Sequence, residues 1–152
     1  MQKIESISEY DAIFLNGNER DNSNIKSLIN KFNKSIPIFE STYNPINIDQ
    51  LDTNAKYVIF SGIGNPDSFR ETVINSRLKI VKEIIFPDHY QYTANDIDNI
   101  MLHAKRLDAQ ILTTEKDYTK ISSHKNNDIK FLEIDIVIKG EEKLIDYLKL
   151  HI

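Results

Sequence analysis

The chain has no cysteine and no tryptophan, and only 4 of its 152 residues are glycine and 4 are proline. Without cysteine, disulfides, thiolate nucleophiles and thiolate metal ligands are excluded, which fits a reducing compartment such as the cytoplasm. No apolar run approaches the roughly 18 residues of a membrane span, so no transmembrane segment is expected. The opening MQKIESISEYD also lacks a basic segment followed by an apolar core, so no export signal is expected.

The chain is mildly acidic, with a formal net charge of −4, and its lysines and arginines are scattered along the sequence. Because binding to nucleic-acid phosphates requires a basic patch or stripe, nucleic acid is not an expected partner. Hydrophobic residues make up 40% and charged residues 28%, a composition typical of a folded globular protein. We expect a single domain over residues 1–152, with an internal boundary in the polar, proline-bearing segment near 41–55.

Six short runs rich in β-branched and aromatic residues are predicted to be strands. They are Tyr10–Leu15, Ile36–Phe39, Lys56–Ser61, Leu78–Phe86, Ile111–Thr113 and Phe131–Ile138. Segments of helical periodicity lie between and after them, with expected starts at the N-cap Ser23, at Pro66, at a Thr93 and Asp96 capping box, at Lys116 and after Gly140. This alternation predicts the α/β class, a largely parallel sheet with helices on both faces.

A glycine motif, Ser61-Gly62-Ile63-Gly64-Asn65-Pro66, joins a predicted strand to a predicted helix. Backbone amides and the helix dipole can hold an anion at such a turn, so Gly62, Gly64 and Asn65 are candidate cofactor-binding residues. The third glycine of a dinucleotide fingerprint is missing, because position 67 is aspartate, which disfavours a dinucleotide oxidoreductase. The structural alternative is a tight turn without a ligand.

A second motif, IFPDHYQYT, places Asp88 and His89 after another predicted strand. The carboxyl ends of strands are where open α/β sheets bind ligands, and an imidazole exchanges protons near neutral pH. Asp88 and His89 are therefore candidate catalytic residues, with a plain loop histidine as the alternative, whereas Tyr90 and Tyr92 are expected to pack. The four histidines show no metal-ligand spacing, so no metal site is predicted.

A third motif, Thr113-Thr114-Glu115-Lys116-Asp117, follows a further strand and should lie at the same edge of the sheet. Thr114, Lys116 and Asp117 are candidate contacts to a cofactor. The alternative is a capped helical turn, in which Thr113 or Thr114 is the cap.

Together and in this order, FSGIGNPDSF, IFPDHYQYT and LTTEKD resemble the carboxy-terminal half of the tetraacyldisaccharide 4'-kinases, the lipid A 4'-kinases. The resemblance covers nearly the whole chain and is densest between Ser61 and Lys120. It implies a Rossmann-like three-layer lobe of a P-loop kinase that transfers phosphate from ATP, with Mg²⁺, to the 4'-hydroxyl of a lipid A disaccharide precursor. It also implies that His89 pairs with an aspartate of the first lobe and helps to deprotonate that hydroxyl, with Asp88 as a secondary candidate.

One departure from the family pattern is decisive for activity: the sequence contains no Gly-x-x-x-x-Gly-Lys-Ser/Thr phosphate-binding loop. ATP and Mg²⁺ are therefore expected mainly in an amino-terminal P-loop lobe, which becomes the expected partner, and the chain alone is expected to be inactive. The resemblance implies a location at the inner face of the inner membrane of a Gram-negative bacterium. The competing interpretation is a noncatalytic or degenerate α/β module that binds a nucleotide or another anion.

Overall fold

The computed structural model describes residues 7, 9–17, 19–33, 35–121 and 128–151. Most of the segment MQKIESISEYD, in which no export signal is expected, lies outside these residues. The chain divides into two compact units, one formed by Met1–Asn44 with Asp135–Ile152 and the other by Pro45–Ile134. The chain passes from the first unit to the second inside the 41–55 segment. A single domain with an internal boundary there stays a prediction.

The second unit is built on a four-stranded sheet with the order β4-β3-β5-β6. Its strands are β3 (Lys56–Ser61), β4 (Lys79–Ile85), β5 (Gln110–Thr114) and β6 (Ile129–Leu132). All three neighbouring pairs are parallel, which confirms the predicted α/β class. Five of the six residues of β3 are buried, as expected for a continuous apolar run at the centre of a parallel sheet.

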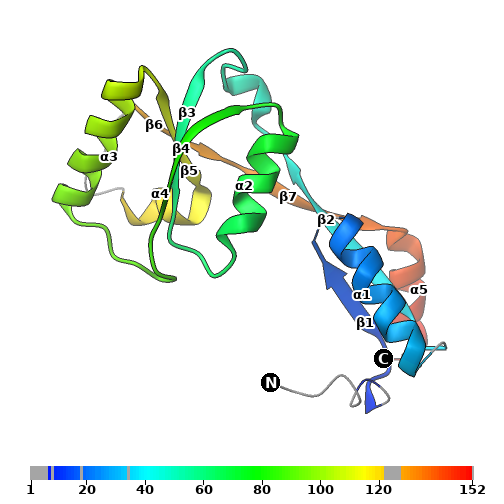
Figure 1. Ribbon diagram of the computed structural model, residues 1–152. Coiled ribbons are helices and arrows are strands. Elements are labelled where there is room, and N and C mark those ends of the chain that lie inside the picture. Colours follow the sequence, from blue (N-terminus) through cyan, green and yellow to red (C-terminus); the bar gives the residue numbers. More distant parts are fainter. Residues whose placement is uncertain (1–6, 8, 18, 34, 122–127, 152) are drawn as a thin grey trace. The chain divides into compact units, whose positions relative to one another are not determined.

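Helices cover both faces of this sheet, and Figure 1 shows α2 and α3 on opposite sides of it. The helices of this unit are α2 (Pro66–Asn75), α3 (Ala94–Leu107) and α4 (Glu115–Lys120). Successive side chains of a strand point to opposite faces, so β3 supplies two cores. Phe60 lies in one apolar cluster with Ile97 of α3. Ile59 lies in another with Phe69 and Val73 of α2.

The first unit contains a three-stranded sheet with the order β1-β2-β7, in which β1 and β2 are parallel. Its elements are β1 (Ile13–Asn16), α1 (Glu19–Phe32), β2 (Ile38–Pro45), β7 (Ile134–Lys139) and α5 (Glu141–His151). Ile29 of α1 is buried, and the rings of Phe39 and Tyr147 pack with their centroids 5.3 Å apart. No helix in the described ranges is both long enough and apolar enough to cross a membrane.

The predicted elements differ from the structure in several details, among them that β2 continues to Pro45, into the segment 41–55 expected to be a loop. Ser23 is not an N-cap, because α1 already begins at Glu19; the first turn is polar, so the apolar periodicity starts later than the helix. The predicted strand Phe131–Ile138 is two strands, β6 and β7, which belong to different sheets. Between them Asn47 accepts a hydrogen bond from the backbone N–H of Glu133 and donates one to the carbonyl of Phe131, a long-range contact that the local pattern does not reveal.

Candidate functional site

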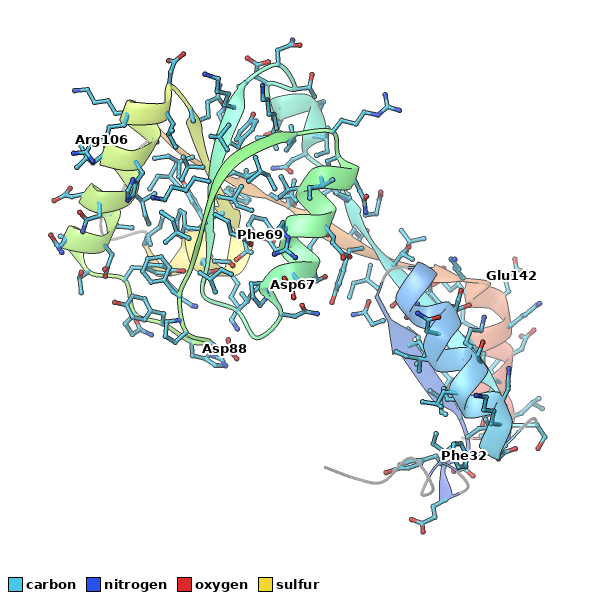
Figure 2. All side chains as sticks on the ribbon, in the orientation of Figure 1. Phe32, Asp67, Phe69, Asp88, Arg106 and Glu142 are labelled. Carbon is cyan, nitrogen blue, oxygen red and sulfur yellow. The ribbon has the colours of Figure 1, made fainter. Side chains whose placement is uncertain are left out.

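The carboxyl edge of the four-stranded sheet brings the three motifs together. The chain runs from β3 outward to β4, then crosses back over β3 to β5, so the strand order reverses between β3 and β5. In open α/β sheets such a reversal is where ligands bind. The three motifs directly follow β3, β4 and β5. Figure 2 shows Asp88 at the end of the unit opposite to Arg106, which lies in the last turn of α3.

Asp117 forms the buried centre of this edge. The backbone N–H of Gly62 donates to its Oδ2 over 2.8 Å, and the Thr114 hydroxyl donates to the same oxygen over 2.9 Å. The Lys120 ammonium donates to Oδ1 over 2.8 Å. Burial acts to raise the pKa of the Asp117 carboxyl, but the hydrogen bonds from Lys120, Gly62 and Thr114 outweigh burial and lower this pKa below its ordinary value. Asp117 is therefore held as a carboxylate.

Gly62 is required by close packing. A Cβ atom at this position would lie 2.9 Å from the Tyr92 hydroxyl oxygen, 3.2 Å from the Pro87 carbonyl oxygen and 3.3 Å from the Tyr90 Cβ. At Gly64 the corresponding Cβ would lie 3.3 Å from Oδ2 of Asp88. The two glycines therefore let the turn after β3 pack directly against the turn after β4.

Asp88 and His89 occupy a tight turn that the Tyr90 N–H closes by donating to the Pro87 carbonyl over 3.2 Å. His89 has a φ of 59°, a left-handed conformation that is uncommon outside glycine and often marks a functional site. The backbone N–H of His89 donates to Oδ1 of Asp88 over 2.9 Å, and its Nε2 lies 3.7 Å from Oδ2. Lys116 approaches from the turn after β5, with Nζ 3.8 Å from Oδ1 of Asp88.

The His89 side chain is presented to solvent, with 77% of its surface exposed, whereas Asp88 and Lys116 are about half exposed. The three motifs therefore place an accessible imidazole, a carboxylate and an ammonium group at one edge. This set can accept a proton and attract an anionic group.

An aromatic cluster around Tyr92 packs next to the turn that carries Asp88 and His89. The ring of Tyr92 packs edge-on against Phe60, Phe86 and Tyr90, with centroids 5.5, 5.1 and 5.5 Å away. This confirms the packing role expected for Tyr90 and Tyr92. The Tyr92 hydroxyl is buried and forms no hydrogen bond of good geometry among the described residues, and burial together with the nearby Asp117 carboxylate raises the pKa of this phenol, so it stays neutral.

Three polar residues of the motifs cap helices. The Asn65 side chain accepts from the Ser68 N–H at the start of α2, and Thr114 accepts from the Asp117 N–H at the start of α4. Thr93 and Asp96 form the predicted capping box of α3. The hydrogen bonds of Asn65 and Thr114 are thus partly used inside the fold, and the roles of Gly62, Gly64, Asn65, Thr114, Lys116 and Asp117 as cofactor contacts stay predictions.

Lys120 was not anticipated from the sequence. Its ammonium lies 3.4 Å from the Gly62 carbonyl oxygen and 5.9 Å from the centroid of the Tyr92 ring, in addition to its ion pair with Asp117. The available signal was the i, i+3 spacing of Asp117 and Lys120, which is common in solvated helices. Only the burial of α4 against the β3 turn distinguishes this pair from a surface pair.

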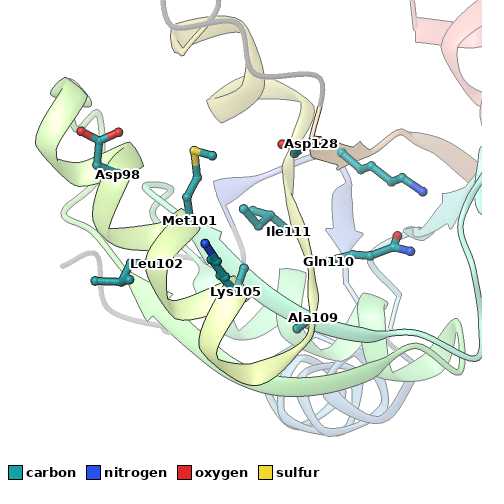
Figure 3. A pocket seen from close by; sticks show the side chains of 10 residues that line it. Asp98, Met101, Leu102, Lys105, Ala109, Gln110, Ile111 and Asp128 are labelled. Carbon is teal, nitrogen blue, oxygen red and sulfur yellow. The ribbon is translucent and has the colours of Figure 1, made fainter.

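A hollow of about 670 Å³ lies elsewhere on this unit. Its walls come from α3 and from the amino-terminal ends of β5 and β6, opposite to the edge that carries the motifs, as Figure 3 shows for Met101, Lys105 and Gln110. Within the described ranges, no three His, Asp or Glu side chains are grouped so that they could hold a metal ion.

The fold and this edge define an α/β protein with a parallel sheet whose reversal point carries an exposed histidine. Residues 2–152 match the family model described as "Tetraacyldisaccharide-1-P 4'-kinase", and the chain belongs to this family. This finding confirms the resemblance carried by the three motifs.

Relatives and a solved structure agree with the family assignment. The chain is 40% identical over 147 residues to the tetraacyldisaccharide 4'-kinase of Pelagibacter ubique, covering 97% of this chain and 47% of that protein. It is 40% identical over 116 residues to the enzyme of Rickettsia bellii, covering 76% of this chain and 34% of that one. The chain thus spans about half the length, or less, of these relatives.

The fold resembles that of LpxK from Aquifex aeolicus, solved as the "apo" form in complex with ATP. The TM-score is 0.55 at 21% sequence identity, covering 97% of this chain and 44% of that structure. At this identity the likeness supports the α/β fold alone.

Proposed function

We propose that the chain acts as the carboxy-terminal lobe of a tetraacyldisaccharide 4'-kinase. The complete enzyme transfers phosphate from ATP to the 4'-hydroxyl of a lipid A disaccharide precursor, in the cytoplasm at the inner face of the inner membrane. The observation that carries the proposal is the convergence of His89, Asp88 and Lys116 from two loops at the reversal edge, in a chain of this family.

His89 accepts the proton of the 4'-hydroxyl in this proposal. Its ring is exposed and Nε2 lies 3.7 Å from Oδ2 of Asp88, so a protonated imidazole would have a carboxylate nearby to stabilise its charge. Phosphoryl transfer depends mainly on positioning and on charge stabilisation, and a general base adds to these by removing the hydroxyl proton. Lys116, half exposed beside Asp88, is placed to attract a phosphate group at the same edge.

ATP as the phosphoryl donor is supported by the ATP complex of the Aquifex aeolicus neighbour. The residues of this chain can supply only a part of an ATP-binding site. The Gly62 N–H already donates to Asp117, Asn65 caps α2, and the sequence holds no phosphate-binding loop. ATP and Mg²⁺ therefore require ligands from an amino-terminal P-loop lobe, and the 152-residue chain alone is expected to be inactive.

A complementation experiment tests the proposal. The chain is mixed with the part of the Pelagibacter ubique relative that it does not match, and ATP-dependent phosphorylation of the tetraacyldisaccharide 1-phosphate is measured. Activity is expected only with both parts, and His89→Ala should lower it. Arg106→Ala is the matched control, because Arg106 lies at the end of α3 that is far from the carboxyl edge. It should leave the phosphorylation activity unchanged. Normal turnover of the His89→Ala protein would remove His89 from the mechanism.

The second candidate is a noncatalytic α/β module that binds a nucleotide or another anion, which the missing phosphate-binding loop favours. Calorimetry of the chain alone with ATP and with the disaccharide phosphate separates the two. Binding of either ligand without activity in the complementation experiment favours the module. Activity on complementation favours the kinase lobe.

A further inference from the structure

Gly62 is held at both polar groups of its backbone by two side chains of α4. Its N–H donates to Oδ2 of Asp117 over 2.8 Å, and its carbonyl accepts from the Lys120 ammonium at 3.4 Å. Asp117 and Lys120 also form an ion pair of 2.8 Å, in which the Asp117 side chain is fully buried and that of Lys120 is 15% exposed. The end of β3 is thereby fixed to the helix that follows β5.

Gly62 in turn lies directly against the loop that carries His89. The atoms nearest to its missing Cβ are the Tyr92 hydroxyl, the Pro87 carbonyl oxygen and the Tyr90 Cβ, all between 2.9 and 3.3 Å away. Pro87 and Tyr90 are the two ends of the turn whose middle residues are Asp88 and His89. Lys120 adds a second contact, because its ammonium lies 5.9 Å from the centroid of the Tyr92 ring. A shift of Gly62 must therefore move the His89 turn.

A buried ion pair by itself contributes little to stability. Desolvation of two charges offsets most of their attraction, and well-packed apolar residues of similar volume are often at least as stabilising. What charged groups add is direction: the 2.8 Å hydrogen bond to Asp117 and the longer contact with Lys120 fix Gly62 at a defined place, which apolar contacts do not do. Catalytic groups need such support, since misplacement by about 1 Å can cost a factor of about 100 in rate.

We propose that Asp117 and Lys120 are positioning residues that hold the His89 turn in place through Gly62. Asp117 is fully buried and so acts through its neighbours and not by touching substrate. The effect on catalysis rests on the proposed kinase function, whereas the effect on the turn does not. The sequence suggested Asp117 as a cofactor contact, and its burial under Gly62 favours the positioning role.

The test compares the 152-residue chain with the variant Asp117→Leu/Lys120→Met, which replaces the pair by apolar side chains of similar size and leaves no uncompensated charge. Residual dipolar couplings of the Asp88, His89 and Tyr90 amides are measured relative to those of β3 and β5. We expect the turn couplings to change while the strand couplings are retained. Asp146→Asn/Lys149→Met, which removes an exposed i, i+3 pair of α5, is the control and should change neither. Unchanged turn couplings in the folded double variant would overturn the proposal.

A milder variant covers the case in which the double variant does not fold. Lys120→Gln keeps a hydrogen-bond donor and is similar to lysine in size. It should change the same couplings in the same direction as the double variant, but by a smaller amount. If the Lys120→Gln protein is folded and the turn couplings equal those of the wild type, the proposal is wrong.

Kinetics of the complemented enzyme give the second readout. The double variant should lower kcat about 10- to 100-fold and leave both KM values within about twofold, because the turn and not the binding surface is disturbed. A raised KM with unchanged kcat would contradict the positioning role. Since the couplings require no activity, an inactive complemented wild type would count against the proposed function alone.

Discussion

The backbone N–H of Gly62 donates to the buried carboxylate of Asp117 over 2.8 Å, across 55 residues of sequence. This hydrogen bond joins the turn after β3 to the helix after β5, at the point where the strand order of the sheet reverses. The turn that presents His89 packs against the same glycine. The arrangement of the edge therefore depends on a few contacts around Gly62, and each can be tested by a single substitution.

Gly62→Ala should destabilise the chain by about 1–3 kcal/mol, because the new methyl group would lie 3.2 Å from the Pro87 carbonyl oxygen and 2.9 Å from the Tyr92 hydroxyl, and backbone cannot yield as a flexible side chain can. Gly64→Ala meets only the end of the Asp88 side chain and should cost less than about 1 kcal/mol. Urea unfolding at neutral pH measures both. Equal costs for the two glycines would contradict the close-packing role of Gly62.

Lys120→Met should cost about 3–5 kcal/mol at pH 7, because it leaves the buried Asp117 carboxylate without its cation. The pKa of Asp117 is lowered in the folded chain, so folding releases protons around pH 4 and its stabilising effect is complete above the unfolded pKa. The effect is lost as the pH falls through the folded pKa. The difference between wild type and variant should therefore stay nearly constant from pH 7 down to about 4 and shrink as the pH falls further.

Urea unfolding at a series of pH values measures this difference. Lys149→Met, which breaks an exposed ion pair, is the control and should change stability by less than about 1 kcal/mol at every pH. A Lys120→Met cost that stays constant or grows as the pH falls below about 4 would show that Asp117 and Lys120 are not coupled as a buried pair.

Tyr92→Phe should leave stability unchanged or raise it by up to about 1 kcal/mol, because it removes a buried hydroxyl that forms no hydrogen bond of good geometry among the described residues and keeps the packed ring. Tyr90→Phe is the matched comparison. It removes the hydroxyl that donates to Asp96 over 3.2 Å and should cost about 0.5–1.5 kcal/mol. Thermal unfolding compares the two, and a larger loss for Tyr92→Phe would show that its hydroxyl forms a stabilising hydrogen bond with the nearby Asp117 carboxylate.

The fold class and the positions of the motifs follow from local patterns. Strands β3, β4 and β5 each have their own apolar run, and Thr93 with Asp96 forms a capping box that spacing alone predicts. The order of parallel strands then places all three motifs at one edge, so Asp88, His89 and Lys116 could be expected to meet.

What the sequence could not reveal depends on contacts between distant residues. Lys120 looks like a surface lysine until α4 is packed over Gly62, 58 residues away. Asn47 separates β6 from β7 through hydrogen bonds to Phe131 and Glu133, which lie 84 and 86 positions further along the chain. The left-handed backbone of His89 has only a weak signal in its residue type, since histidine adopts this conformation more often than most residues but still uncommonly.

The most direct measurement is the kcat of tetraacyldisaccharide phosphorylation by the complemented kinase with His89→Asn. Asparagine tolerates the left-handed backbone of this turn but cannot act as a base, so folding should be retained. We predict a kcat about 100- to 10,000-fold below that of the wild-type mixture, with the melting temperature nearly unchanged. A folded His89→Asn chain that supports phosphorylation at the wild-type rate would contradict the account.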